Sequence, residues 1–392
     1  MAPFNENLLR EIKNMEEKME EKTEEKTEDI GLFYKMLARR PMIDVIQDEE
    51  EQKHWAKTFK NSNSITLYSW RNEWVRNVKD NKEHFKYFHR DHSVKVFHNE
   101  LLNKPIILVG AGPSLQKNIK YLKLAKEKGI KILANHHALM YLAREDVNIK
   151  PDYVIVLDSG KMWDEYYAFD KMDYSDVPLL ADMTCNTEQL KKWKGPVYFF
   201  KSSYPDNEIA KFLKMEIERF VPAHEYPSQL EVGGHAGGAA LGIAIGILQV
   251  NQVIFIGHDY CFAPDTGKFY PFDHKIDQVV VTENHDGTES EKPAPPPPQG
   301  QILDIFGNTV MTNNAYLGFK NVMDLGIRAN KLDRLSKNQE LDFINATEGG
   351  SLGSVMGGNS KWMYYMRFED AIHYAHDKNL KLEEERKKQE DK

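Results

Sequence analysis

The sequence contains only two cysteines among its 392 residues, Cys185 and Cys261. Two cysteines cannot build the disulfide framework of a small secreted domain, and their separation does not match the ligand spacing of a zinc site. The longest apolar run, Ala236 to Val250, is shorter than a bilayer requires and is interrupted by glycines. The N-terminus is acidic and polar, unlike a signal peptide. We therefore expect no membrane span and a cytoplasmic location.

Basic residues are in the minority, with 52 Lys and Arg against 60 Asp and Glu and a formal net charge of −8. A net negative charge repels phosphate, which argues against a general nucleic-acid-binding protein. The hydrophobic content of 41% and the charged content of 29% are typical of a soluble globular chain. At this length we expect two to three domains and a large core.

The first hundred residues lack strand patterns and are highly charged. Residues 1–30 contain the repeat EEKM-EEKT-EEKT, which places like charges four residues apart in a helix. Like charges at this spacing repel, so we predict a frayed helical arm, with coiled-coil pairing as the alternative. Residues 31–103 mix aromatic side chains with charges of both signs. This pattern predicts a helical domain with its aromatics inside, and nucleic-acid binding is the alternative.

The central residues 104–330 alternate short apolar runs with helical patterns. Strands are predicted at 106–109, 131–134, 153–157, 177–180, 197–200 and 252–256, and helices at 115–128, 138–144, 188–193, 208–220 and 236–250. This alternation predicts an α/β fold, a doubly wound, Rossmann-like and mostly parallel sheet with helical additions at both ends of the chain.

Two further segments flank or interrupt this core. Residues 283–300 contain four consecutive prolines, which predict a stiff, extended insertion. Its position after the last predicted strand leaves two interpretations, a solvated linker or a lid over the site. Helices are predicted at 316–331 and 362–381, and residues 331–392 form a C-terminal helical region with a charged tail.

A glycine-rich turn follows the first strand of the core. Gly110 and Gly112 have no Cβ, which lets backbone N–H groups approach a ligand. Pro113 suits a first helical position, and Ser114 adds a hydroxyl. A helix starting behind this turn would direct its free N–H groups at an anion, most often phosphate. The alternative is a tight strand-to-helix turn without a ligand.

Polar residues follow several predicted strands, at the edge where open α/β sheets bind ligands. They are Asn135, Asp158, Asp182, His258 and Asp259. Each alone also fits ordinary loop or helix-cap chemistry, but together they favour a site. The stretch GGHAGGAAL at Gly233 to Leu241 is a second glycine-rich helix start. It suits an anion or a carboxylate, and close packing of its glycines is the alternative.

Six motifs occur in an order that resembles one protein family. They are GAGPSL after the first strand, KPDYVIVLD ending at Asp158, GGHAGGAAL, VIFIGHD ending at Asp259, DIFGNTVMT ending at Thr312 and INATEGG ending at Gly350. Together they resemble the motility accessory factor (Maf) proteins and the MptE-like 6-hydroxymethylpterin diphosphokinase domain within them. The resemblance covers about residues 104–350. The core also resembles bacterial sialyltransferases, whose first motif reads GNGPSL.

The resemblance implies transfer of a nonulosonic acid from a CMP-activated donor, of pseudaminic, legionaminic or sialic acid type, to Ser or Thr of flagellin or another surface protein. Ala111 replaces an asparagine of the sialyltransferases, and His136 replaces a glutamine. The residues expected to bind the nucleotide are Gly110, Ala111, Gly112, Pro113, Ser114, Asn135, His136, Asp158, Gly237, Gly238, Gly257 and His258.

The reaction also requires a base that takes the proton of the acceptor hydroxyl, and histidine suits this role near neutral pH. The sialyltransferase histidine follows the strand that ends in Gly-Ile-Asp, so the resemblance leaves His274 and His285 as candidates and adds Asp259 as a third catalytic residue. This interpretation requires a nucleotide sugar and a protein acceptor, and no metal or cofactor. It leaves open whether the chain forms oligomers.

Two alternatives come from other functional classes. A 6-hydroxymethylpterin diphosphokinase would use ATP and Mg²⁺, with Asp158, Asp182 and Asp259 as the metal ligands. No Walker lysine is present, so this interpretation depends on the family resemblance. A non-catalytic nucleotide-binding accessory protein is the second alternative.

Overall fold

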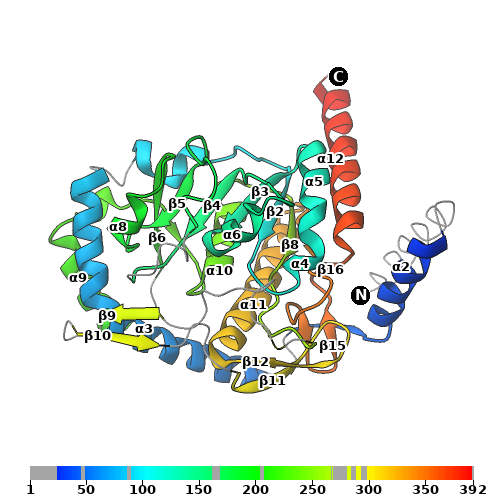
Figure 1. Cartoon of the computed structure of the whole chain (residues 1–392), viewed down its shortest axis with the longest axis horizontal. Coiled ribbons are helices and arrows are strands. Elements are labelled where there is room, and N and C mark those ends of the chain that lie inside the picture. Colours follow the sequence, from blue (N-terminus) through cyan, green and yellow to red (C-terminus); the bar gives the residue numbers. More distant parts are fainter. Residues whose placement is uncertain are drawn as a thin grey trace.

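The computed structural model describes residues 24–45, 49–85, 90–160, 168–203, 207–265, 267, 280–283, 288–292 and 298–390. Its centre is a nine-stranded sheet in the order β16-β13-β8-β2-β3-β4-β5-β6-β7, in which every neighbouring pair is parallel (Figure 1). The strands are β2 (Pro105–Val109), β3 (Lys131–Asn135), β4 (Tyr153–Val156), β5 (Leu179–Asp182), β6 (Val197–Ser202), β7 (Gln229–Leu230), β8 (Gln252–Ile256), β13 (Asp342–Asn345) and β16 (Tyr364–Tyr365).

The central strands are buried on both faces, which explains their continuous apolar sequences. Every residue of β2 and β8 is buried. Successive side chains alternate between two hydrophobic cores: Ile107 and Val109 belong to one, and Ile106 and Leu108 to the other. A sheet with a core on each face is doubly wound, so the predicted fold class is confirmed.

Helices cover both faces of the sheet. The first core includes residues of α3 (Glu49–Phe85), α4 (Leu115–Asn118), α5 (Leu122–Glu127), α6 (Leu139–Leu142), α8 (Thr187–Leu190), α9 (Glu208–Glu218) and α12 (Phe368–Glu390). The second core includes residues of α10 (Ala236–Gly242), the π-helical turn Ile243–Ile247 and α11 (Asn314–Ser336). The far end of α12 extends away from the rest of the molecule (Figure 1).

Three predicted helices differ in the structure. The helix predicted at 115–128 is interrupted by a 3₁₀ turn, Ile119–Tyr121. The helix predicted at 236–250 continues as a π-helix from Ile243. The prediction of a helix from Trp362 was wrong at its start, because residues 364–365 pair with β13 as strand β16. Helix α12 begins instead at Phe368, whose N–H donates to the Glu348 carboxylate at 2.8 Å.

Helix α3, within the predicted N-terminal domain, packs against the main core. Trp74 and Phe85 of α3 pack against the first core, which also contains Val78. Two 3₁₀ turns, Arg90–His92 and Val94–Phe97, lead from this region into β2. Trp74 and Phe85 are therefore part of the hydrophobic packing of the sheet domain.

Helix α2 (Glu24–Leu37) begins inside the segment predicted as a frayed arm, and residues 1–23 lie outside the described ranges. Ile30, Phe33 and Tyr34 of α2 form a small cluster that Phe306 joins. The Tyr34 hydroxyl donates to Asp370 of α12 at 2.8 Å. These contacts attach α2 to the C-terminal part of the chain.

The boundary predicted at residue 330 falls inside α11, and β13 and β16 beyond it belong to the same sheet. Smaller sheets surround it. They are β1 (Met42–Ile43) with β15 (Gly358–Ser360) and β14 (Ser354–Val355), β9 (Val280–Glu283) with β10 (Glu289–Lys292), and β11 (Gly300–Leu303) with β12 (Thr309–Thr312). Part of the proline-rich insertion forms β10, and residues 293–297 lie outside the described ranges. Within the described ranges, no helix is long and apolar enough to cross a membrane.

Candidate functional site

The order of the strands creates a switch point between β2 and β8. From β2 the chain adds β3 to β7 on one side and then returns to add β8 on the other. Crossover connections therefore diverge above the carboxyl ends of β2 and β8, where open α/β sheets bind ligands. The turn Gly110–Ser114 follows β2, and the turn Gly257–Asp259 follows β8.

These two turns are bonded to each other. The Gly112 N–H donates to the Gly257 carbonyl at 2.8 Å, and the Gly110 N–H donates to the Ile256 carbonyl at 2.9 Å. A Cβ on Gly110 would lie 2.9 Å from the Gly257 carbonyl carbon, and one on Gly112 would lie 2.7 Å from the Gly257 oxygen. The close contact between the turns therefore requires glycine at both positions, a reason that differs from the predicted approach of a ligand.

The turn Gly110–Ser114 already binds a carboxylate of the protein itself, that of Asp259. Ser114 donates to Asp259 Oδ2 through its Oγ at 2.7 Å and through its N–H at 3.2 Å. Burial raises the pKa of Asp259 to about 6, although the hydrogen bonds from Ser114 oppose this shift. Helix α4 behind the turn has only four residues. The N–H groups of Gly112 and Ser114, predicted to face a phosphate, are thus engaged by groups of the β8 turn.

The segment after β13 covers Asp259 from another direction. Ser351 donates to the Asp259 carbonyl through its N–H at 2.8 Å and its Oγ at 2.9 Å. A Cβ on Gly350, whose φ is +72°, would lie 2.7 Å from the Asp259 Cα. Asp259 therefore joins the ends of β2, β8 and β13. The sequence shows these motifs in order, but only the pairing of β13 with β8 brings them together.

The second glycine-rich turn also reaches the switch point. His235 caps α10 by accepting a hydrogen bond from the Gly238 N–H at 3.3 Å. A Cβ on Gly237 would lie 2.9 Å from the Tyr260 hydroxyl, which lies 3.4 Å from His258 Nδ1. Burial lowers the pKa of His235 to about 3 and that of His258 to about 4. Both histidines are therefore neutral at physiological pH and offer no positive charge to a phosphate.

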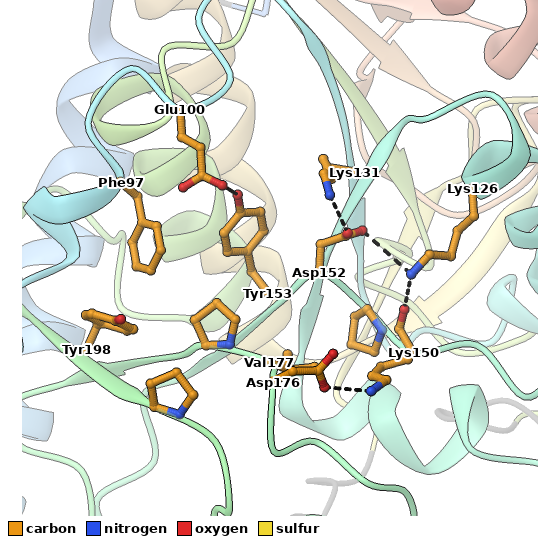
Figure 2. Close-up of a pocket in the computed structure, with 13 residues that line it drawn as sticks. Phe97, Glu100, Lys126, Lys131, Lys150, Asp152, Tyr153, Asp176, Val177 and Tyr198 are labelled. Carbon is orange, nitrogen blue, oxygen red and sulfur yellow. Dashed lines mark hydrogen bonds and ion pairs between the residues drawn. The ribbon is translucent and has the colours of Figure 1, made fainter.

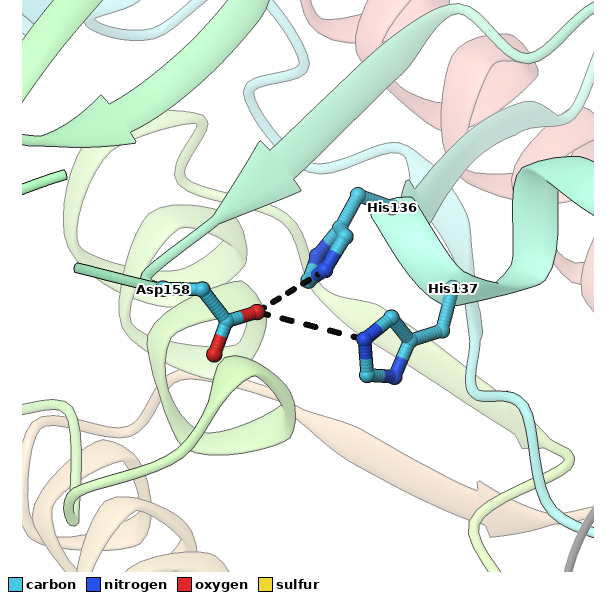
Figure 3. A group of neighbouring side chains, drawn as sticks. All are labelled: His136, His137 and Asp158. Carbon is cyan, nitrogen blue, oxygen red and sulfur yellow. Dashed lines mark ion pairs between the residues drawn. The ribbon is translucent and has the colours of Figure 1, made fainter. Parts of the chain in front are cut away.

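A second group of polar side chains lies at the ends of β3 and β4, namely His136, His137 and Asp158 (Figure 3). Asp158 Oδ2 lies 2.8 Å from His136 Nε2 and 3.9 Å from His137 Nε2. Burial by itself would raise the pKa of Asp158, but the charge and hydrogen bond of His136 and the charge of His137 hold it below its ordinary value.

Asn135 and His137 lie in the same region. The Asn135 side chain accepts a hydrogen bond from the Ala138 N–H at 3.0 Å and so caps the turn that carries the histidines. His137 was not predicted as a site residue. The signal that could have found it is the pair of consecutive histidines directly after a strand.

The carboxylates required by the diphosphokinase alternative are not brought together. Asp182 accepts four hydrogen bonds, from the N–H and hydroxyl groups of Thr184 at 2.8 and 2.6 Å and of Ser202 at 2.8 and 2.5 Å. Among the described His, Cys, Asp and Glu residues, the one group that converges to metal-ligand distances is His136, His137 and Asp158. The predicted metal set of Asp158, Asp182 and Asp259 is thus not assembled among the described residues, and it stays a prediction. His274 and His285, the predicted bases, lie outside the described ranges.

A surface cavity of about 440 Å³ lies at the opposite, amino-terminal edge of the sheet (Figure 2). Its charged residues are paired with each other: Lys131 Nζ lies 2.9 Å from Asp152, and Lys150 Nζ lies 2.6 Å from Asp176. It includes none of the predicted site residues. We therefore place the candidate site at the carboxyl edge, where the motifs meet.

The central part of the chain is similar to known proteins. Residues 72–265 match the family model of 6-hydroxymethylpterin diphosphokinase MptE-like proteins. No curated protein sequence matches the chain. Among solved structures, it is similar to a Maf glycosyltransferase from Magnetospirillum magneticum AMB-1, with 15% identity and a TM-score of 0.48 over 79% of this chain. The chain spans 42% of that protein's length. Residues 72–265 of this chain are therefore similar to an MptE-like domain.

Proposed function

We propose that the chain is a Maf-like glycosyltransferase that moves a nonulosonic acid from a CMP-activated donor to a Ser or Thr hydroxyl of flagellin or another surface protein. The observation that carries this proposal is the meeting of three glycine-rich turns at one switch point. Gly110–Ser114, His235–Gly238 and Gly257–Asp259 are far apart in the sequence but contact one another directly or through Tyr260. Turns at this position are where α/β sheets bind nucleotides.

The transfer has simple chemical requirements. The bond between the anomeric carbon of the sugar and the phosphate oxygen breaks, and CMP leaves with the electron pair. A bond forms between that carbon and the acceptor oxygen, and a base takes the hydroxyl proton. The donor phosphate is stabilised as it leaves by hydrogen-bond donors or dipoles directed at it.

We assign Asp259 a positioning role in this reaction. Its carboxylate is bonded to Ser114, its carbonyl is bonded to Ser351, and Gly350 packs against its Cα. A carboxylate so enclosed is suited to holding three strand ends in place and has little room to reach an acceptor. The role of base therefore stays with His274 or His285, as the sequence resemblance implies.

A diphosphokinase remains the second candidate because the matching family model carries that description. It requires ATP and Mg²⁺, which prefers carboxylate and phosphate oxygens. The separation of Asp158, Asp182 and Asp259 argues against the metal set that we expected for it. A nucleotide-binding accessory protein without catalysis is the third candidate.

Calorimetric titration of the full chain with CMP, CTP and ATP, each with and without Mg²⁺, separates the three candidates. We expect CMP to bind with an affinity that Mg²⁺ does not change. A response confined to ATP with Mg²⁺ would overturn the transferase proposal in favour of the diphosphokinase. Binding of CMP without release of CMP from a CMP-nonulosonate in the presence of Ser/Thr peptides would favour the accessory role.

A matched pair of serine variants locates the nucleotide. Ser114→Ala removes the hydroxyl that positions Asp259 at the switch point, whereas Ser336→Ala removes an exposed hydroxyl bonded only to the Asp333 carbonyl. Because a hydrogen bond to a charged group contributes about 1.5–3 kcal/mol, we expect Ser114→Ala to weaken CMP binding by about tenfold or more. Equal CMP affinity in both variants would exclude the switch point as the nucleotide site.

A further inference from the structure

We propose that His136, His137 and Asp158 bind a divalent transition-metal ion of the zinc class at the carboxyl ends of β3 and β4. One ligand atom from each residue lies within 4.8 Å of the other two, and Figure 3 shows the three side chains directed toward one another. This proposal is independent of the proposed function, because it rests on the ligand geometry alone.

The local backbone explains how two adjacent histidines serve one site. Successive residues of a strand point to opposite faces of the sheet. After β3, however, residues 136–138 form a 3₁₀ turn, which the Asn135 side chain caps through the Ala138 N–H. The turn brings both imidazole rings to the same side, with their centroids 4.1 Å apart. The cap thus orients the two nitrogen ligands together.

The third ligand is held by a separate set of contacts. Asp158 follows β4, and its carbonyl accepts a hydrogen bond from the Asn186 N–H at 3.2 Å. The next residue, Ser159, offers its carbonyl to the Asn77 side chain of α3 at 2.9 Å. Asn77 also donates to the Thr184 carbonyl at 2.9 Å. The ligands therefore stand on anchored backbone at two neighbouring strand ends, as precise metal sites require.

The distances fit a small metal ion. Bonds of about 2.0–2.2 Å in a tetrahedral zinc site place the ligand atoms about 3.3–3.6 Å from each other. The observed separations from Asp158 Oδ2, 2.8 Å to His136 Nε2 and 3.9 Å to His137 Nε2, lie on either side of this range. These two separations therefore differ from the range by only about 0.5 Å and 0.3 Å.

The types of ligand select the class of metal. Two imidazoles and one carboxylate suit Zn²⁺, Co²⁺, Ni²⁺ or Fe²⁺, whereas Mg²⁺ and Ca²⁺ prefer oxygen ligands alone. Three protein ligands leave a further coordination position for water or for an oxygen of an anionic ligand. The His136 side chain is 3% exposed, but those of His137 and Asp158 are 21% and 32% exposed. An ion can therefore enter from the side of His137 and Asp158.

The test uses the full chain after treatment with a chelator and dialysis. Zn²⁺ and, separately, Co²⁺ are then added, and bound metal is measured by elemental analysis while Co²⁺ is followed by its visible absorption. We expect one high-affinity equivalent per chain and the intense visible bands of Co²⁺ with four or five ligands. The absence of a high-affinity equivalent would overturn the proposal.

Variants show whether bound metal occupies this site. Asp158→Asn keeps the shape of the side chain and an oxygen that can accept from His136, and His137→Ala removes the more exposed ring. Each is expected to weaken metal affinity by about 100-fold or more, since even partners outside the first coordination shell commonly contribute 10- to 100-fold. The control His224→Ala, at a side chain that is 81% exposed, should bind as the unaltered chain does.

Circular dichroism and thermal melting without metal establish that both variants are folded. Asp158→Asn is the decisive variant if His137→Ala is unstable. Metal that binds equally to Asp158→Asn and to the unaltered chain would mean that the ion lies elsewhere and that the three side chains form only an ion pair.

Discussion

Asp259 is the residue on which the candidate site depends most. It accepts hydrogen bonds from Ser114 at the end of β2, and its carbonyl accepts from Ser351 after β13. It is only 4% exposed, which raises its pKa from the ordinary value of 3.8 to about 6. Burying the Asp259 carboxylate between the three strand ends therefore costs free energy, which its hydrogen bonds from Ser114 partly offset.

This raised pKa predicts how stability depends on pH. A carboxyl whose pKa is higher in the folded state favours folding below the unfolded pKa, and that contribution is lost as pH rises through the folded pKa. In Asp259→Asn the titration is absent. As pH rises from 5 to 8, the unfolding free energy of the unaltered chain should therefore fall by about 1 kcal/mol relative to that of Asp259→Asn.

Denaturant unfolding at several pH values measures this difference. Asp333→Asn, on the exposed side of α11, is the matched control for removal of one aspartate charge. A pH-independent difference for Asp259→Asn would show that the pKa of Asp259 is not raised.

Position 112 has no room for a side chain larger than that of glycine. A Cβ at this position would lie 2.7 Å from the Gly257 carbonyl oxygen and 2.8 Å from the Asp259 carboxyl carbon. Backbone cannot move aside cheaply, so Gly112→Ala should lower the unfolding free energy by about 1–3 kcal/mol. Chemical denaturation followed by circular dichroism measures the loss. Unchanged stability would contradict the close contact of the two turns.

Single substitutions also test which of the two candidate histidines, His274 or His285, acts as the base. If the chain is the proposed transferase, either His274→Ala or His285→Ala should lower kcat by about 10²- to 10⁴-fold, the usual contribution of a general base. Release of CMP from a CMP-nonulosonate in the presence of a Ser/Thr peptide is the assay. CMP affinity should be retained in the impaired variant. Full turnover in both variants would exclude both histidines as the base.

At the scale of elements, α11 connects the outer hairpin to the sheet. Asn313 caps its start by accepting from the Tyr316 N–H at 3.0 Å. In its middle, the buried Lys320 ammonium lies 2.6 Å from Asp324, which also accepts from the Gly353 N–H at 2.9 Å. These contacts fix the helix between the second core and the segment after β13.

One position of α11 is not optimised for stability. Gly318 lies in the helix, and a Cβ built there has nothing within 4 Å. Because glycine is less favourable than alanine in a helix by about 0.8–1 kcal/mol, Gly318→Ala should raise the unfolding free energy by about that amount. The same denaturation assay applies, and Gly112→Ala gives the opposite sign with the same chemical change. A destabilised Gly318→Ala would mean that the helix needs glycine there.

At the scale of the whole molecule, the sheet is continuous across the boundary of the matched family segment. That segment ends at residue 265, but β13 lies beyond it and pairs with all four positions of β8 from Gln252 to Phe255. Val253, Ile254 and Phe255 of β8 are fully buried. Removing β13 would expose this strand as a hydrophobic edge, which favours aggregation.

We therefore expect the fragment 24–265 to lose cooperative thermal unfolding and to aggregate. The matched control is a chain that ends after Leu380, where only the exposed end of α12 is removed. Circular dichroism melting and size-exclusion chromatography compare the two. A sharp transition in fragment 24–265, equal to that of the full chain, would show that this fragment folds without β13.

The sequence by itself predicted the α/β class and most of the central strands. A strand that is buried on both faces must be apolar along its length, so β2 and β8 are visible as local patterns. Strand β13 was not predicted, because Asp342 and Asn345 make it look polar. In the structure Asp342 is paired with Lys331 and Lys378, and Asn345 donates to the Leu352 carbonyl.

Only the tertiary structure decided what the site residues contact. Gly112 and Ser114 matched an anion-binding turn in the sequence. In the structure the Gly112 N–H donates to the Gly257 carbonyl, and Ser114 donates to the Asp259 carboxylate, 145 residues further along the chain. His137 lies near Asp158 because β3 and β4 are neighbours. The physical reason is that burial and strand propensity depend on nearby residues, whereas the distance between two strand ends depends on the order of the strands in the sheet. That order is set by the crossovers, which no local pattern specifies.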